Sequence, residues 1–148
     1  MATALFPGSF DPFTTGHEAV LRRILPLFDR VVVAIGLNSD KMNSDGTPGG
    51  MMTVEERIER ISRMLADCPT VEVTSYTGMT IDLCHRIGAQ CIIRGIRTAA
   101  DFEYEQRMAF VNRKLDPTVE TLLVMADNEH INISSTLERE RMSHGNSE

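Results

Sequence analysis

The most informative part of this sequence is the run Leu5-Phe6-Pro7-Gly8-Ser9-Phe10-Asp11-Pro12-Phe13-Thr14-Thr15-Gly16-His17. It joins a short apolar run, through a loop of polar and turn-forming residues, to the start of an amphipathic helical pattern. This order predicts a β-strand, a loop large enough for a phosphate group, and a helix N-terminus. The first N–H groups of a helix have no partner within the helix, so they favour an anion. Because a histidine there can donate a hydrogen bond to a phosphoryl oxygen, the stretch predicts a nucleotide site.

The rest of the chain repeats this alternation of strand-like and helix-like patterns. Runs typical of strands are Thr3–Phe6, Val31–Gly36, Val71–Ser75, Gln90–Arg94 and Thr121–Met125. Helical patterns cover His17–Phe28, Val54–Leu65, Thr80–Ile87, Asp101–Leu115 and a terminal helix that opens at Ser134-Ser135-Thr136. Such alternation predicts βαβ crossovers. The expected fold class is therefore α/β, a single domain over residues 1–148 with a doubly wound parallel sheet.

Local signals set several of the predicted boundaries. Pro26 indicates that the first helix ends early or bends, because proline cannot donate a helical hydrogen bond. Thr53 and Glu56 have the spacing of a capping box, and Gly88 suits the left-handed residue that ends a helix. The Gly-rich segment Asn38–Met52 is longer than most connections, which predicts a mobile or functional loop.

Composition narrows the classes of function. The net charge of -6 and the pI near 5.2 argue against nucleic acid as a partner, since that affinity needs Lys and Arg to neutralise phosphates. The three cysteines lack metal-ligand spacing, so they are expected to be small buried side chains in a reducing compartment. No segment has the pattern of a membrane span or a signal peptide, and we expect a cytoplasmic protein without membrane contact.

Three predicted loops share one property, because each follows a strand and precedes a helix. Their polar residues are Ser9, Thr14 and His17 in the first loop, Arg94 and Arg97 in the second, and Ser134, Ser135 and Thr136 in the third. Lys41, after the strand Val31–Gly36, would join them from a fourth loop. In open parallel sheets ligands bind at the carboxyl ends of the strands. Guanidinium groups, hydroxyls and helix-end amides at that edge predict a pocket for several phosphates.

Each of these residues also has a purely structural interpretation. The Ser-Ser-Thr run by itself is a helix cap, and Lys41 by itself is a solvent-exposed lysine. A histidine at a helix start is more often structural than catalytic, and Asp11 is explained more easily as a turn residue than as a metal ligand. The two arginines are equally well explained as ion-pair partners of Asp101, Glu103 or Glu105. The phosphate hypothesis is favoured because all four groups fall at strand ends.

At these residues the chain resembles a known family. Pro7-Gly8-Ser9-Phe10-Asp11-Pro12 with Thr14-Thr15-Gly16-His17 is similar to the nucleotidylyltransferase superfamily motif in its Thr-x-Gly-His form. The chain also resembles bacterial phosphopantetheine adenylyltransferases, through a longer and more specific set of motifs. These motifs are Ile93-Arg94-Gly95-Ile96-Arg97, Asp101-Phe102-Glu103-Tyr104-Glu105, Asn112-Arg113 and Ile133-Ser134-Ser135-Thr136. The resemblance runs in order from about Ala4 to about Arg141 and implies a Rossmann-like nucleotidylyltransferase fold.

The resemblance implies a reaction and its residues. The family transfers the adenylyl group of ATP to 4′-phosphopantetheine, giving dephospho-coenzyme A and pyrophosphate in coenzyme A synthesis, with Mg²⁺ arriving on the ATP phosphates. The implied catalytic residues are His17, Lys41 and Arg94. The implied ATP-binding residues are Ser9, Phe10, Gly16, His17, Arg97, Glu105, Ser134, Ser135 and Thr136. The implied phosphopantetheine-binding residues are Ser9, Lys41, Met79, Thr80 and Arg94.

The implied chemistry needs no nucleophile from the enzyme, because one phosphate attacks another. Catalysis would consist of aligning two polyanions and stabilising charge on the α-phosphoryl oxygens. The family forms hexamers, which implies a homo-oligomer here. Against the family pattern, the chain has a shorter C-terminal end, a longer Asn38–Met52 loop and no acidic residue in Thr77-Gly78-Met79.

Two alternatives therefore stay open. One is a nucleotidylyltransferase with another acceptor, such as nicotinate mononucleotide or a polyol phosphate. The other is a catalytically silent module that binds a nucleotide or coenzyme A. Parallel acceptor assays separate the first alternative from the implied reaction, and binding of ATP without turnover would identify the second.

Overall fold

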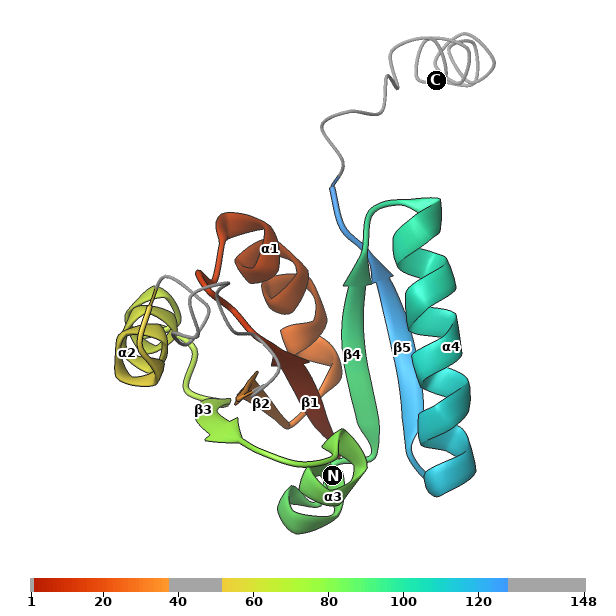
Figure 1. Ribbon diagram of the computed structural model, residues 1–148. Helices are drawn as coiled ribbons and strands as arrows, with labels where there is room; N and C mark the ends of the chain where they lie inside the picture. The colour runs from red at the N-terminus through yellow and green to blue at the C-terminus, as the bar shows by residue number, and fades with distance from the viewer. Residues whose placement is uncertain (1, 38–51, 128–148) are drawn as a thin grey trace, which may run out of the picture.

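The computed structural model describes residues 2–37 and 52–127, which form a five-stranded parallel sheet with helices on both faces (Figure 1). The strands are β1 (Thr3–Gly8), β2 (Arg30–Gly36), β3 (Val71–Tyr76), β4 (Cys91–Ile96) and β5 (Glu120–Met125). The helices are α1 (Thr15–Ile24), the 3₁₀ turn η1 (Leu25–Leu27), α2 (Val54–Met64), α3 (Thr80–Ile87) and α4 (Ala99–Leu115). The predicted α/β class with a doubly wound parallel sheet is confirmed.

The strand order is β3-β2-β1-β4-β5, so the chain reverses direction across the sheet between β1 and β4. From β1 it adds β2 and β3 on one side, and then it returns to add β4 and β5 on the other. Loops that leave the carboxyl ends of β1 and β4 therefore turn to opposite faces of the sheet. Such a switch point opens a crevice, which is where ligands bind in sheets of this kind.

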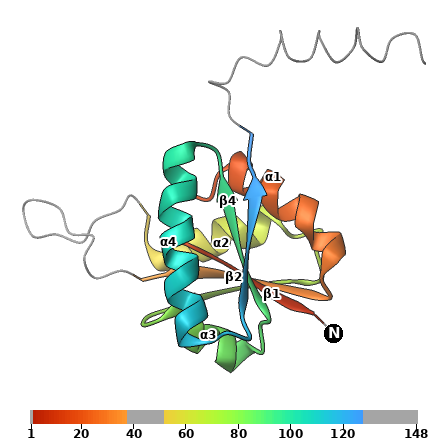
Figure 2. The ribbon, with the colours of Figure 1, turned by 90° about the vertical axis from the view of Figure 1, so that its right-hand side faces the viewer.

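Alternation along β2 divides the apolar core into two layers. Val31, Val33 and Ile35 pack with the residues of α1 and α2, whereas Val32 and Ala34 pack with those of α3. α4 runs along β4 and β5 and contacts α3, on the opposite side of the sheet from α1 (Figure 2). Because both faces are covered, the central strands β1 and β2 are buried along most of their length, which explains their continuous apolar runs.

Several predicted helix boundaries are confirmed, but α1 begins at Thr15, two residues before the predicted start at His17, because the hydroxyl of Thr14 caps the helix. α1 ends at Ile24 and Pro26 lies in the following 3₁₀ turn, as the missing proline N–H requires. Thr53 and Glu56 form the predicted capping box of α2. Gly88 ends α3 with φ of 72°, a left-handed conformation that glycine adopts without strain. No helix in residues 2–37 and 52–127 is long and apolar enough to cross a membrane.

The start of α4 differs from the prediction by two residues. The hydroxyl of Thr98 accepts a hydrogen bond from the backbone N–H of Asp101 at 3.1 Å, so Thr98 is the cap and the helix begins at Ala99. The Asp101 carboxylate in turn accepts from the backbone N–H of Thr98 at 3.3 Å. The difference arises because this capping box ends in Asp, whereas the sequence pattern that marks such a cap has Glu or Gln at that position.

Gly8 ends β1 at a point where Phe10 folds back over it. A Cβ at position 8 would lie 2.8 Å from two ring carbons of Phe10. That ring is 4 % exposed and packs against the ring of Phe6, with centroids 5.4 Å apart, so it has little room to move. We expect Gly8→Ala to lower the free energy of unfolding by about 1–3 kcal/mol, the usual cost of overpacking, as measured by urea denaturation.

Gly16→Ala is the matched control. A Cβ at position 16 would meet only the Thr14 hydroxyl, at an ordinary 3.5 Å, and alanine favours a helix more than glycine does. The stability of this variant should stay the same or rise. A Gly8→Ala protein as stable as the wild type would contradict the close packing of Phe10 on the strand end.

Candidate active site

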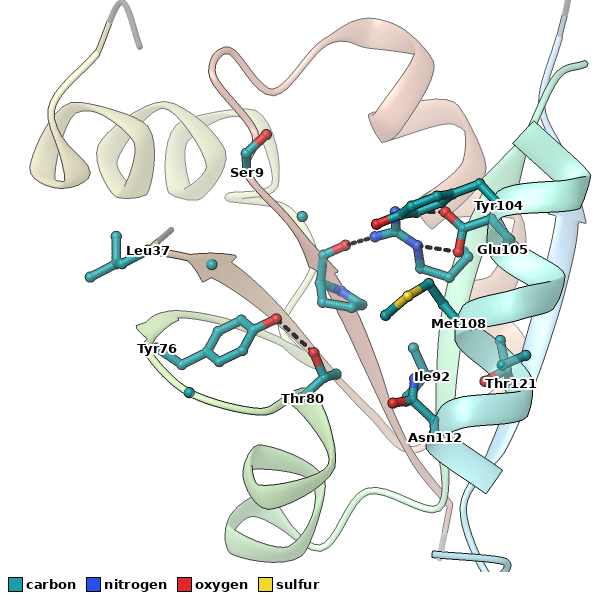
Figure 3. A pocket seen from close by; sticks show the side chains of 16 residues that line it. Ser9, Leu37, Tyr76, Thr80, Ile92, Tyr104, Glu105, Met108, Asn112 and Thr121 are labelled. Carbon is teal, nitrogen blue, oxygen red and sulfur yellow. Dashed lines mark hydrogen bonds and ion pairs between the residues drawn. The ribbon is translucent and has the colours of Figure 1, made fainter. Parts of the chain in front are cut away.

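Two cavities open at the carboxyl ends of the strands, on either side of the switch point. The first has a volume of about 590 Å³ and lies between the ends of β1, β2 and β3 and the inner face of α4 (Figure 3). The second, of about 460 Å³, lies between the loop after β1, the start of α1 and the start of α4. The residues that line both are Pro7, Gly8, Ser9, Arg94, Tyr104 and Glu105. Two cavities of ligand size with one shared wall suit a reaction between two bound molecules.

The phosphate loop, residues 9–14, is held from behind by α2. Arg57 donates from Nη1 to the carbonyl of Ser9 at 3.1 Å, and Arg60 donates from Nε to the carbonyl of Phe13 at 2.8 Å. The Asp11 carboxylate accepts from the backbone N–H of Met52 at 2.9 Å, which ties the loop to the segment before α2. Neither arginine lines either cavity, so these bonds fix the loop while its other side faces the second cavity.

His17 is the third residue of α1 and has both structural and ligand-facing atoms. The ring Nδ1 of His17 accepts a hydrogen bond from the backbone N–H of Thr14 at 3.0 Å, and the backbone N–H of His17 donates to the Thr14 hydroxyl at 3.3 Å. Because Nδ1 is an acceptor, the neutral ring carries its proton on Nε2. The rings of Phe10 and Phe13 lie 5.1 and 5.4 Å from the imidazole and hold its plane. His17 therefore offers the second cavity a fixed Nε2–H donor.

Burial lowers the pKa of His17 below its ordinary value of 6.5, and the positive charges of Arg97 and then Arg94 lower it further. Desolvation and neighbouring cations both disfavour the imidazolium form. His17 is consequently neutral near pH 7, and it can donate from Nε2 without first losing a proton. The charge that favours a bound anion comes from the two arginines.

Arg94 lies on the wall that the cavities share. Its Nε and Nη2 donate to the two carboxylate oxygens of Glu105 at 2.9 and 2.8 Å, and its Nη1 donates to the carbonyl of Pro7 at 2.5 Å. Dashed lines in Figure 3 mark these bonds beside Glu105. Arg94 therefore forms an ion pair with Glu105, as the structural interpretation of the sequence suggested. The same pair also lines both cavities.

Arg97 follows β4 and lines the second cavity. Its backbone N–H donates to the Asp101 carboxylate at 3.0 Å, so this carboxylate serves the start of α4. The positive charge of Arg97 reaches the imidazole of His17, whose pKa it lowers. The two residues come from different loops, and the sheet brings them to the same cavity as the sequence predicted.

The residues predicted from the sequence fall into five groups. Phe10, Gly16, His17 and Arg97 line the second cavity, Ser9, Arg94 and Glu105 line the shared wall, and Thr80 lines the first cavity. Met79 lines neither cavity; it is the cap residue of α3 and is 45 % exposed. Lys41, Ser134, Ser135 and Thr136 lie outside the described residues.

Several residues of the site were missed in the sequence. Tyr76 and Asn112 line the first cavity, and the Tyr76 hydroxyl lies 3.0 Å from that of Thr80. Arg57 and Arg60 support the phosphate loop. The one available signal was their spacing of three, which puts two arginines on the same face of α2. Their targets are backbone carbonyls far away in the sequence, which no motif reveals.

Comparison with known sequences finds nucleotidylyltransferases over nearly the whole chain. The sequence model of the cytidylyltransferase-like family matches residues 5–141. The phosphopantetheine adenylyltransferase of Leptospira biflexa is 38% identical over 142 residues, covering 96% of this chain and 84% of its own length. That of Phocaeicola vulgatus is 44% identical over 145 residues, covering 98% of this chain and 91% of its own.

Solved structures share the fold. The lipopolysaccharide core biosynthesis protein from Thermoplasma volcanium matches with a TM-score of 0.61 and 21% identity, covering 86% of this chain and 99% of its own. A bifunctional NMN adenylyltransferase/ADP ribose pyrophosphatase from Francisella tularensis matches with a TM-score of 0.59 and 19% identity. This chain is covered to 97% in that match and the longer neighbour to 42%. At these identities the likeness supports the Rossmann-like fold alone.

We expect the imidazole of His17 to titrate below pH 6.5, as followed by NMR of its ring protons. Arg97→Ala should raise this pKa, because removal of a nearby positive charge favours the imidazolium form. The unfolded chain takes up the proton more readily than the folded one. The free energy of unfolding should therefore fall as the pH drops below 6.5.

Arg63→Ala is the control for this titration, since Arg63 is an exposed residue of α2 that pairs with Glu59. It should leave the His17 titration unchanged. A wild-type midpoint at or above 6.5 would contradict a neutral, buried imidazole. Equal midpoints in the wild type and in Arg97→Ala would show that the Arg97 charge does not reach it.

Proposed function

Because the chain belongs to the phosphopantetheine adenylyltransferase family, we propose that its two joined cavities hold the two substrates of adenylyl transfer, ATP and 4′-phosphopantetheine. The family reaction gives dephospho-coenzyme A and pyrophosphate, a step of coenzyme A biosynthesis. One observation carries the proposal: Arg94 and Ser9, the first residue of the phosphate loop, line the wall that two cavities of ligand size share. The alternatives of another acceptor and of a silent binding module have no comparable support.

We assign ATP to the second cavity and phosphopantetheine to the first. The second cavity has the start of α1, the His17 donor and Arg97, a set that suits a polyphosphate. The first is lined by the Tyr76 and Thr80 hydroxyls and by apolar side chains such as Met108, which suit a long acceptor with an amide-containing arm.

In this arrangement the reacting phosphates meet at the shared wall. An oxygen of the acceptor phosphate forms a bond to the α-phosphorus of ATP. The bond from that phosphorus to the bridging oxygen of the β-phosphate breaks, and pyrophosphate leaves with the electron pair. Arg94 holds the acceptor phosphate and offsets the repulsion between two anions, while Nε2–H of His17 donates to an α-phosphoryl oxygen as charge develops there.

The other residues that the resemblance implies enter as proposals. Lys41 would hold the acceptor phosphate together with Arg94. Ser134, Ser135 and Thr136 would bind the β- and γ-phosphates at a helix start. Met79, exposed in the structure, would line the pantetheine arm only if the arm extends past Thr80 along α3.

Mg²⁺ enters the proposal as part of the substrate, bound to the ATP phosphates. Residues 2–37 and 52–127 contain no group of three or more His, Cys, Asp or Glu side chains that could hold a metal ion. A magnesium ion that keeps most of its waters and binds through substrate phosphates does not need such a group. The cytoplasmic location expected from the sequence stays a prediction.

We also propose that the chain assembles into a homo-oligomer, a hexamer by resemblance. Large apolar side chains are exposed along α4 and β5; they are Phe102, Tyr104, Met108, Phe110, Val111, Leu115, Leu122 and Met125. Tyr104 and Met108 also line the first cavity, and exposure of the other large apolar side chains is typical of an interaction surface. Light scattering of the purified protein should give a mass several times that of the 16.5 kDa chain, and a monomer mass would refute the assembly.

The reaction itself is tested by ATP formation from dephospho-coenzyme A, pyrophosphate and Mg²⁺, with His17 variants alongside. We expect turnover by the wild type and a fall in kcat of about 10²–10³-fold in His17→Asn, the usual loss for one such donor. Asn keeps an acceptor near the Nδ1 position for the cap of α1 but has no donor at the Nε2 position, so folding and KM should change little.

His17→Gln is the matched variant, because its amide N–H lies near the Nε2 position and should restore part of the rate. Nicotinate adenine dinucleotide with pyrophosphate, run in parallel, tests the other acceptor. Turnover with that dinucleotide and none with dephospho-coenzyme A would overturn the proposed acceptor. Unchanged kcat in His17→Asn would remove His17 from the mechanism.

A further inference from the structure

Glu105 is the one buried charged residue of the described part of the chain, at 6 % exposed, and it lies beside a site proposed to bind anions. An isolated buried carboxylate is costly, and here the cost is offset by the paired hydrogen bonds from Arg94. A carboxylate at that place would repel a phosphate if it faced the substrate alone. Both of its oxygens accept from the same guanidinium, so its negative charge is directed at Arg94.

The pairing with Glu105 leaves some N–H donors of Arg94 for other partners. A guanidinium has five N–H donors in a rigid fork. Two are used by Glu105 and one by the carbonyl of Pro7. Two therefore remain after these bonds, on Nη1 and Nη2, and the group sits on the wall that both cavities share. The three bonds come from α4 and β1, so they fix the orientation of the fork from two directions.

We propose that Glu105 is a positioning residue: it acts through Arg94, holding the guanidinium so that its two remaining donors meet a phosphate where the two cavities join. The inference rests on the proposed function for the identity of that phosphate. It departs from the resemblance, which puts Glu105 among the ATP ligands. In the structure both carboxylate oxygens of Glu105 accept from Arg94, and in the proposal it is Arg94 that contacts the phosphate.

A double-mutant cycle tests this, with Glu105→Gln, Arg94→Ala and the double variant. We expect Arg94→Ala to raise KM for phosphopantetheine more than KM for ATP. Glu105→Gln alone should lower kcat/KM for phosphopantetheine about 10–100-fold, the scale of a lost charged hydrogen bond. In the Arg94→Ala background the same change should cost less than about twofold, because its target is gone.

Binding measurements separate positioning from direct contact. Titration calorimetry with ATP alone should give nearly the same affinity for the wild type and Glu105→Gln. A loss of ATP affinity that persists in the Arg94→Ala background would overturn the inference, since it would make Glu105 a nucleotide ligand. Glu59→Gln, which breaks an exposed ion pair on α2, is the control and should leave every parameter unchanged.

A readout that is independent of activity keeps this test separate from that of the proposed function. The Nε–H of Arg94 should exchange slowly with solvent in the wild type and rapidly in Glu105→Gln, as seen in ¹⁵N NMR. Glu105→Asp, which keeps the charge on a shorter side chain, should give intermediate exchange and intermediate kcat/KM. Equal exchange rates in the wild type and Glu105→Gln would overturn the positioning role. A wild type that binds ATP but does not use phosphopantetheine would instead refute the proposed function.

Discussion

β1 and β4 are neighbours in the sheet, but they pair over a short length. Only two residue pairs are in register, Ala4 with Cys91 and Leu5 with Ile92, whereas β1 pairs with β2 along its whole length. Beyond Leu5 the two central strands separate. The carbonyl of Pro7 then accepts from Arg94, a residue 87 positions away, instead of from a backbone N–H of the neighbouring strand. The switch point is thus spanned by a guanidinium, and the two cavities exist because the strands part there.

This geometry resolves an electrostatic conflict. The protein carries a net charge of -6, yet the proposed reaction brings two phosphorylated molecules into contact. Arg94 and Arg97 concentrate positive charge where the two central strands separate, and this charge adds to burial in lowering the pKa of His17. Glu105 weakens that positive potential, but it also fixes the orientation of Arg94. An arginine side chain held by a bidentate carboxylate has lost most of its conformational freedom before a substrate binds.

The sequence predicted those parts of the molecule that depend on neighbouring residues. The strand runs, the capping box of Thr53 and the end of α3 at Gly88 are local features, and the structure confirms them. His17 lies in the first turn of α1 rather than at its first residue. The support of the phosphate loop by Arg57 could not be predicted, because it joins backbone and side chain across 48 positions. The pairing of Arg94 with Glu105 was one of several possibilities, since only folding selects among the acidic residues that follow it.

The structural and functional interpretations of a residue, treated as alternatives in the sequence, are combined in the folded chain. His17 caps α1 through Nδ1, and that bond is the reason its proton lies on Nε2, where a ligand can use it. Arg94 is an ion-pair partner, and that pairing leaves two donors fixed at the junction of the cavities. In both cases the structural bond determines which atom is left to do chemistry. A cap or an ion pair at the end of a strand is therefore no argument against a catalytic role, because it supplies the preorganisation that such a role requires.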